Sequence, residues 1–175
     1  MKNNTATLAI RKETILTLSV LIGIAVAAPL LIKQQLITGT IVNATLILGT
    51  ARLGARDGLL IGLLPSSIAL ATGLLSPVLA PMIPFIIVGN AILVLTFSYL
   101  KNLNYWVGAA AGSLFKFAFL YGTSNIVVGL LINKQAAPAV ANMMSWMQLV
   151  TALAGGIVAF GVIKALGKLH LVKVQ

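Results

Sequence analysis

Long apolar runs separated by short polar or charged segments recur along the whole chain. A helix needs about 20 predominantly apolar residues to cross the hydrocarbon core of a bilayer. The predicted spans are residues 14–32, 37–51, 58–75, 80–100, 105–132 and 145–163. We therefore predict an all-α integral membrane protein, with one transmembrane domain of six helices over residues 1–175.

Three of these spans are irregular. The second is short and is entered through the polar stretch KQQLITGT, so we expect it to be tilted or partly loop. Pro65 should kink the third span, and the prolines between residues 77 and 84 predict an irregular entry to the fourth. The fifth is too long for one perpendicular crossing, so we expect its outer part to be either tilted or folded over the entrance.

Composition agrees with a membrane protein. Of the 175 residues, 59% are hydrophobic and 8% are charged, a balance that suits lipid better than water. The net charge of +10 does not indicate nucleic-acid binding, because the basic residues are scattered singly between apolar runs. The first span should stay in the mature protein, since its apolar part is longer than the roughly 7–15 residues of a signal peptide.

The basic residues predict the orientation, because they concentrate on the cytoplasmic side of membrane proteins. If the N terminus is inside, Lys33 and Lys134 fall outside and Lys116 lies within a span. The remaining nine then fall inside: Lys2, Arg11, Lys12, Arg52, Arg56, Lys101, Lys164, Lys168 and Lys173. Both termini are basic, so an even number of crossings with both ends in the cytoplasm is predicted.

Catalytic chemistry is not expected. The sequence has no cysteine, one histidine in the tail (His170), and two acids, Glu13 and Asp57, both at the cytoplasmic boundary. No acid–base pair, nucleophile triad or metal-ligand cluster can form within the membrane, and no phosphate-binding loop is present. We predict no enzymatic activity, no cofactor and no metal; any ATP hydrolysis would occur in a partner.

Polar side chains within the spans are the candidate binding residues. Most fall in the predicted outer half and are expected to converge on an outward-facing pocket: Thr40, Asn43, Thr72, Asn90, Tyr121, Asn125, Trp146 and Gln148. The alternative for each amide is a hydrogen bond that merely joins two helices. Trp146 is either an interfacial belt residue or a stacking wall for a flat ligand.

Lys116 is the sharpest of these features. It follows Asn104 by twelve residues, which places it roughly 18 Å into a core of about 30 Å. No acid in the sequence can neutralise it at that depth. There are two alternatives. In the first, the side chain snorkels outward or is held neutral among carbonyl groups of the protein; in the second, it meets an anionic or carbonyl group of a ligand. We favour the ligand.

Three segments resemble the substrate-binding S component of energy-coupling factor (ECF) transporters: ITGTIVNATLIL, LGARDGLLIGLLPSSIALATG and APMIPFIIVGNAILV. The resemblance covers nearly the whole chain. It implies a vitamin-capturing subunit of a prokaryotic plasma membrane that docks on a membrane T component and two cytoplasmic ATPases. It also implies ligand-binding roles for Gln34, Thr40, Asn90, Lys116, Tyr121, Asn125, Trp146 and Gln148.

The sequence departs from the family at two points. An Ala-x-x-x-Ala pair often faces the T component from the first helix, and the nearest equivalent here is Gly23 with Ala27. No acidic residue is available for a cationic ligand, so a neutral or anionic ligand fits better. Two other functions stay open, a stand-alone small transporter or channel and a membrane assembly protein in which the polar residues only pair helices.

Overall fold

The computed structural model describes residues 2–32, 34–71, 77–131 and 137–168, and the regular elements among them are all helical. The elements are α1 (Lys2–Leu31), α2 (Gln35–Leu53), α3 (Ala55–Ala71), the 3₁₀ helix η1 (Pro77–Met82), α4 (Ile83–Leu100), α5 (Tyr105–Leu131), α6 (Ala137–Met143) and α7 (Trp146–Lys168). The predicted all-α fold is confirmed for this part of the chain.

Five segments of the described chain are long and apolar enough to cross a membrane. They are residues 12–31, 35–53, 80–100, 105–130 and 140–167. The remaining long helix, α3, has 17 residues. The last part of its predicted span, with the candidate Thr72, lies outside the described residues, as do Lys33 and Lys134. The chain is therefore a multi-pass membrane protein with five membrane-length helices in its described part.

The second span was expected to be tilted or partly loop. Its polar start is helical from Gln35 onward, so the loop alternative is wrong for this part, and the tilt stays a prediction. Its hydroxyls are satisfied on nearby backbone, with Thr38 Oγ1 donating to the Ile32 carbonyl at 2.8 Å and Thr40 Oγ1 to the Leu36 carbonyl at 2.7 Å. Because these polar side chains bond locally, they do not interrupt the helix.

The structure also shows the backbone of the other three spans for which an irregularity was predicted, the third, fourth and fifth. The proline-rich entry to the fourth span forms η1, and α3 continues through Pro65. The fifth span is one unbroken helix of 27 residues, about 40 Å long. Of the two alternatives for its outer part, folding over the entrance is wrong as far as Leu131, and tilting stays a prediction. The short helix α6 was not predicted.

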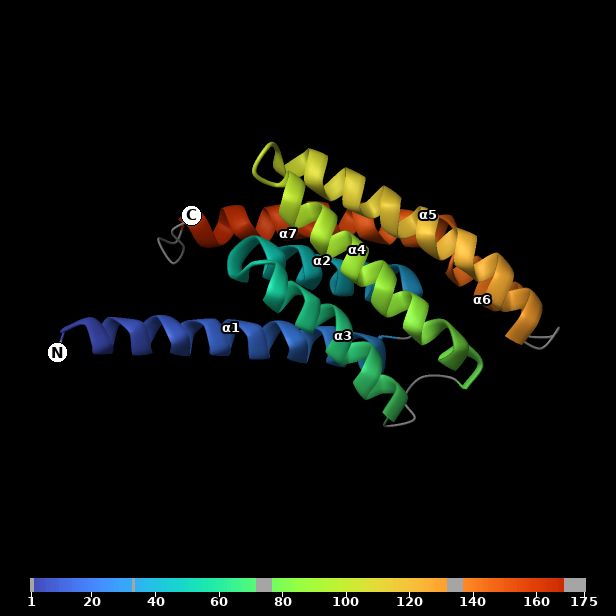
Figure 1. Ribbon diagram of the computed structural model, residues 1–175, viewed down its shortest axis with the longest axis horizontal. Coiled ribbons are helices and arrows are strands. Elements are labelled where there is room, and N and C mark those ends of the chain that lie inside the picture. The colour runs from blue at the N-terminus through green and yellow to red at the C-terminus, as the bar shows by residue number, and fades with distance from the viewer. Residues whose placement is uncertain (1, 33, 72–76, 132–136, 169–175) are drawn as a thin grey trace.

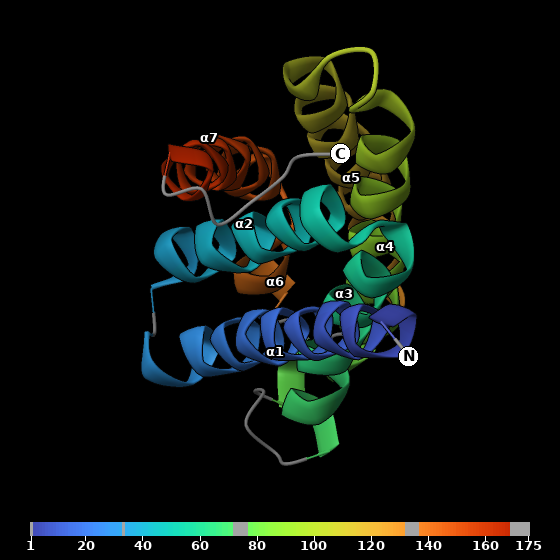
Figure 2. The same ribbon diagram turned by 90° about the vertical axis from the view of Figure 1, so that its left-hand side faces the viewer.

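Helix α2 is central in the bundle. It lies between α1 and α7 and also packs on α3 and α4 (Figures 1 and 2). Its contact with α7 and the contact between α4 and α5 are the two most extensive in the described part. Three polar residues of α2 are buried in this position: Asn43, Thr45 and Thr50.

The helix ends that carry basic residues gather at one end of the bundle. Helix α1 begins, α7 ends, and the α2–α3 and α4–α5 turns lie at this end, which we call the basic end (Figure 1). Arg52, Arg56, Lys101 and Lys164 lie there. Lys101 Nζ donates to the Thr50 carbonyl at 3.0 Å, closing the last turn of α2, and partial burial lowers the pKa of the Lys101 amine.

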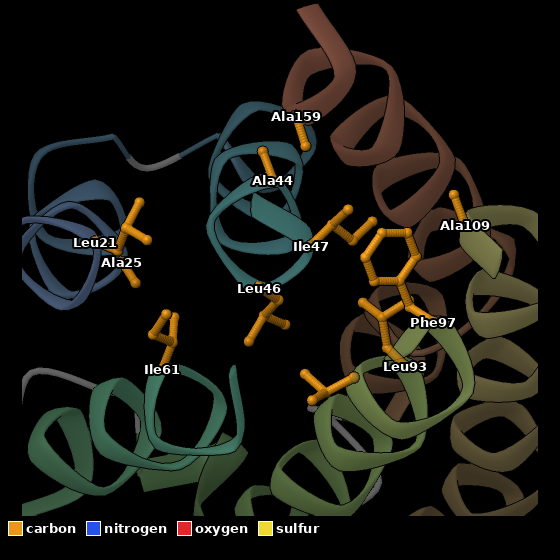
Figure 3. Packing of buried hydrophobic residues seen from close by; sticks show 11 residues of the cluster. Leu21, Ala25, Ala44, Leu46, Ile47, Ile61, Leu93, Phe97, Ala109 and Ala159 are labelled. Atoms are coloured by element: carbon orange, nitrogen blue, oxygen red, sulfur yellow. The ribbon is translucent and has the colours of Figure 1, made fainter. Parts of the chain in front are cut away.

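Two apolar clusters fill the bundle. The first apolar cluster lies toward the basic end and joins α1, α2, α3, α4, α5 and α7 (Figure 3): Leu21, Ala25, Ala44, Leu46, Ile47, Ile61, Leu93, Val94, Phe97, Ala109 and Ala159. The second apolar cluster lies toward the opposite end, around α5, α6 and η1: Met82, Leu120, Val127, Val140 and Met144. The residues that position the candidate site lie between them.

Candidate functional site

Lys116 lies in the middle of α5 and is 3% exposed. It follows Tyr105, the first residue of the helix, by eleven positions, or roughly 16–17 Å along the axis. Its Nζ donates to Asn43 Oδ1 at 2.6 Å and to Asn90 Oδ1 at 2.8 Å. The lysine head group is therefore held between α2 and α4, and it does not snorkel to either end of the bundle.

The two asparagines extend these bonds to further helices. Asn43 Nδ2 donates to Thr151 Oγ1 of α7 at 3.3 Å, and Asn90 Nδ2 donates to the Gly62 carbonyl of α3 at 3.1 Å. The Thr151 hydroxyl in turn donates to the Gln148 carbonyl at 3.2 Å. We call Lys116, Asn43, Asn90 and Thr151 the Lys116 network. It ties five helices at one level of the bundle.

Glycines allow the helices that carry the network to approach closely. A Cβ placed on Gly155 of α7 would lie 2.7 Å from the Asn43 Cβ, and one on Gly62 would lie 3.1 Å from the Asn90 Cβ. A Cβ on Gly39 of α2 would meet the Thr151 side chain at 2.9 Å. Small residues at these positions therefore bring the amide and hydroxyl groups within hydrogen-bonding distance.

The Lys116 network lies between the two apolar clusters, and the order of residues along α5 and α4 shows this. On α5, Ala109 belongs to the first cluster, and Leu120 and Val127, on the other side of Lys116, belong to the second. On α4, Leu93 follows Asn90 and belongs to the first cluster. A polar layer inside an otherwise apolar membrane bundle is costly unless its groups have partners, and here they have them.

The charge of the lysine has no counterion in the described structure. Its described partners are neutral amides. Glu13 is exposed on α1, and Asp57 lies in the first turn of α3 at the basic end. Asp57 precedes Gly62 by five residues, which displaces it about 7.5 Å along α3 and turns it about 140° away from Gly62 around the helix. The acids of the sequence therefore leave Lys116 without a carboxylate partner.

The structure brings together some of the predicted site residues. Asn43, Asn90 and Lys116 bond to one another, and Gln148 joins them through its backbone carbonyl. Thr40, by contrast, bonds within its own helix.

The predicted convergence is wrong for Tyr121 and Asn125. Tyr121 is 51% exposed, and the Asn125 side chain is exposed with its Nδ2 donating to the Tyr121 carbonyl at 3.0 Å. Asn125 follows Lys116 by nine residues, which places it on the opposite face of α5 at 100° per residue. These two side chains therefore face away from the network.

Gln34 and Trp146 lie outside the network, at the end of the bundle opposite the basic end. Both are exposed, Trp146 to 57%. Their proposed contact with a ligand stays a prediction.

Thr151 and Gln35 are site residues that the sequence reasoning missed. Thr151 is the one hydroxyl in the apolar run LVTALAGG, four residues before Gly155 and on the same helix face. Gln35 falls in the polar stretch expected to be partly loop. In the structure Gln35 Nε2 and Gln148 Nε2 both donate to the Met143 carbonyl, at 2.8 and 3.0 Å. These two bonds fasten the end of α6 to α2 and α7.

Replacing Gln35 with alanine should loosen α6. The variant loses the hydrogen bond from α2 to the Met143 carbonyl, a change of about 1 kcal/mol, so we expect amide hydrogen exchange over Val140–Met144 to be roughly fivefold faster. Gln34→Ala is the matched control, because Gln34 is exposed and makes no side-chain cap bond. Unchanged exchange in Gln35→Ala would show that this bond does not hold α6.

The predicted partner surface on α1 is open. Gly23 is exposed, and a Cβ placed on it would meet no atom within 4 Å, whereas Ala27 is partly buried. The helix packs on the bundle through Leu21, Ala25 and Ala28. The role of Gly23 and Ala27 in binding a partner stays a prediction.

Comparison with known proteins adds no relative. No family model, curated protein or solved structure matches this chain.

Proposed function

We propose that the chain is the substrate-capturing S component of an ECF-type importer for a vitamin or related micronutrient. The observation that carries the proposal is the Lys116 network, in which a cation, two amides and a hydroxyl from four helices are buried at mid-depth in an apolar bundle. Ionisable groups at such depth are costly and typically mark a ligand or ion site.

The proposed topology has six spans with both termini in the cytoplasm of a prokaryotic cell. It is supported by the start of α1 and the end of α7, which share the basic end, and by the basic residues of the two turns at that end. On this topology α3, third in chain order, crosses the membrane in addition to the five membrane-length helices, and the second apolar cluster faces the outside of the cell. Cargo would then reach the network from the external side.

The proposed partners are a membrane T component and two cytoplasmic ATPases, which would supply the energy for release of the cargo inside. The resemblance of three long segments to S components is the basis for this part of the proposal. The open face of α1 around Gly23 and Ala27 is the candidate contact for the T component.

One observation favours a second function, a membrane assembly protein whose polar residues only pair helices. The Lys116 and asparagine groups of the network bond to groups of this same chain, so they can act as interhelical ties without a ligand. This alternative predicts neither a cargo molecule nor an ATPase partner.

Affinity purification from native membranes separates these two functions. We expect the tagged wild-type chain to co-purify with two nucleotide-binding subunits and one further membrane protein, in stoichiometric amounts by quantitative mass spectrometry. A tagged, unrelated six-span membrane protein from the same cells is the control. Recovery of the chain with no ATPase subunit, under detergent conditions that preserve other ABC importers, would contradict the proposal.

A further inference from the structure

Lys116 is a buried basic residue with no negatively charged partner in the described part of the chain. The charged residues of the neighbouring helices α2, α3, α4 and α7 lie near the basic end in the described structure: Arg52, Arg56, Asp57, Lys164 and Lys168. On α5 itself Lys116 is the one charged residue. An ammonium group removed from water is stabilised by an opposite charge or by several well-placed acceptors, and here two neutral acceptors are in place.

The two amides are fixed with their oxygens toward the lysine. Each Nδ2 is used on another helix, Asn43 on the Thr151 hydroxyl and Asn90 on the Gly62 carbonyl, so each Oδ1 points toward Nζ. An ammonium group has three N–H donors, and two of them are used by these oxygens. One donor therefore remains for a further acceptor.

The side facing the basic end is closed to a ligand. There Leu93 and Phe97 are fully buried and press against glycines of α5, with a Cβ on Gly112 placed 2.9 Å from the Leu93 side chain. Phe97 also makes an edge-on contact with the Tyr105 ring at 5.3 Å between centroids. Tightly interlocked residues of this kind leave no room for a molecule to pass.

The opposite side is closed by more adaptable residues. The second apolar cluster includes Met82 of η1, Val140 of α6 and Met144, which directly follows α6. The end of α6 is held by the two glutamine bonds to the Met143 carbonyl. Methionine side chains repack readily, and two hydrogen bonds are a small barrier to displacing a seven-residue helix. A ligand would therefore reach Lys116 from the end opposite the basic end.

We infer that Lys116 binds an acidic group of the cargo, so that the cargo is an anion carrying a carboxylate or a group of like charge and shape. The remaining N–H of the ammonium would donate to this group, and Asn43 and Asn90 would hold the lysine in place as positioning residues. The inference rests on the proposed function. That function allows a neutral or an anionic cargo, and the inference selects the anionic one.

Matched pairs of acids and neutral analogues provide the test. The wild-type chain in nanodiscs would be titrated with nicotinate against nicotinamide, pantothenate against pantothenol, and biotin against biotinamide, with thermal stability as the readout. In parallel, small molecules released from the purified protein by denaturation would be identified by mass spectrometry. We expect an acid to stabilise the protein, its neutral analogue to bind roughly 10- to 100-fold more weakly, and the released molecule to be acidic.

Three variants assign the effect to the lysine. Lys116→Met removes the charge and should abolish stabilisation by the acid; Lys116→Gln is a second uncharged variant in case the first does not fold. Ser113→Ala is the matched control, because Ser113 is buried one turn away on α5 and its hydroxyl bonds only to the Ala109 carbonyl in the described structure. It should bind the acid as the wild type does.

The outcomes separate this inference from the proposed function. A neutral analogue that binds as tightly as its acid, a released molecule with no acidic group, or an uncharged Lys116 variant that binds the acid normally would overturn the inference and leave cargo capture standing. A folded wild-type protein that releases no small molecule and responds to none of the six compounds would overturn cargo capture itself, and the inference with it.

Discussion

Replacing Asn90 with leucine should destabilise the protein by about 1.5–3 kcal/mol, the usual effect of losing a hydrogen bond to a charged group. Leucine keeps the branched heavy-atom skeleton of asparagine with bulkier methyl groups in place of the amide, and Lys116 loses one of its two described acceptors. Asn43→Leu should act similarly. The measurement is reversible unfolding in mixed micelles, monitored by circular dichroism.

The same experiment includes an internal rescue. The triple variant Lys116→Met, Asn43→Leu and Asn90→Leu leaves no buried charge without a partner. Replacing a whole set of buried polar groups with apolar side chains is often neutral or stabilising. We therefore expect the triple variant to be more stable than either single asparagine variant and to bind no cargo. A triple variant less stable than both singles would show that the network exists for stability.

Replacing Gly155 with alanine should be the most disruptive single-methyl change in α7. The added Cβ would lie 2.7 Å from the Asn43 Cβ and 2.8 Å from the Ala44 backbone nitrogen, so α2 and α7 must separate. Overpacking of this kind costs typically about 1–3 kcal/mol, and it should also weaken the bond between Asn43 and Thr151. Unfolding in mixed micelles measures the loss.

Gly161→Ala is the matched control for this prediction. Gly161 is in the same helix and a Cβ there meets no atom within 4 Å, so alanine should be neutral or slightly stabilising because it is the better helix former. Equal stability of the Gly155 and Gly161 variants would mean that α2 and α7 are not packed as closely as described.

Much of the fold could be predicted because membrane-length helices follow directly from long apolar runs. The long helices of the structure overlap the predicted spans, although α1 already begins at Lys2 and α6 has no predicted counterpart. The proline-rich entry to α4 forms a 3₁₀ helix. The start of α2 could not be predicted in the same way. Gln35, Thr38 and Thr40 suggest a loop by composition, and their bonds to local backbone and to Met143 became evident only from the packed arrangement.

The candidate site was predicted in part, and its errors have a geometric cause. Depth along a span identified Lys116, Asn43 and Asn90, since these positions share one level of the bundle. Depth says nothing about which side of a helix faces inward. Asn125 is at a suitable depth but lies on the opposite face from Lys116, and Thr151 was overlooked because a single hydroxyl in an apolar run carries no distinct pattern.

Native mass spectrometry of the protein released from its own membrane shows whether Lys116 holds a captured cargo. We expect wild type and Ser113→Ala each to carry one small-molecule adduct per chain, and folded Lys116→Met to carry none. A wild-type chain that emerges bare, or an adduct that persists unchanged in Lys116→Met, would contradict the claim that this buried lysine holds a captured cargo.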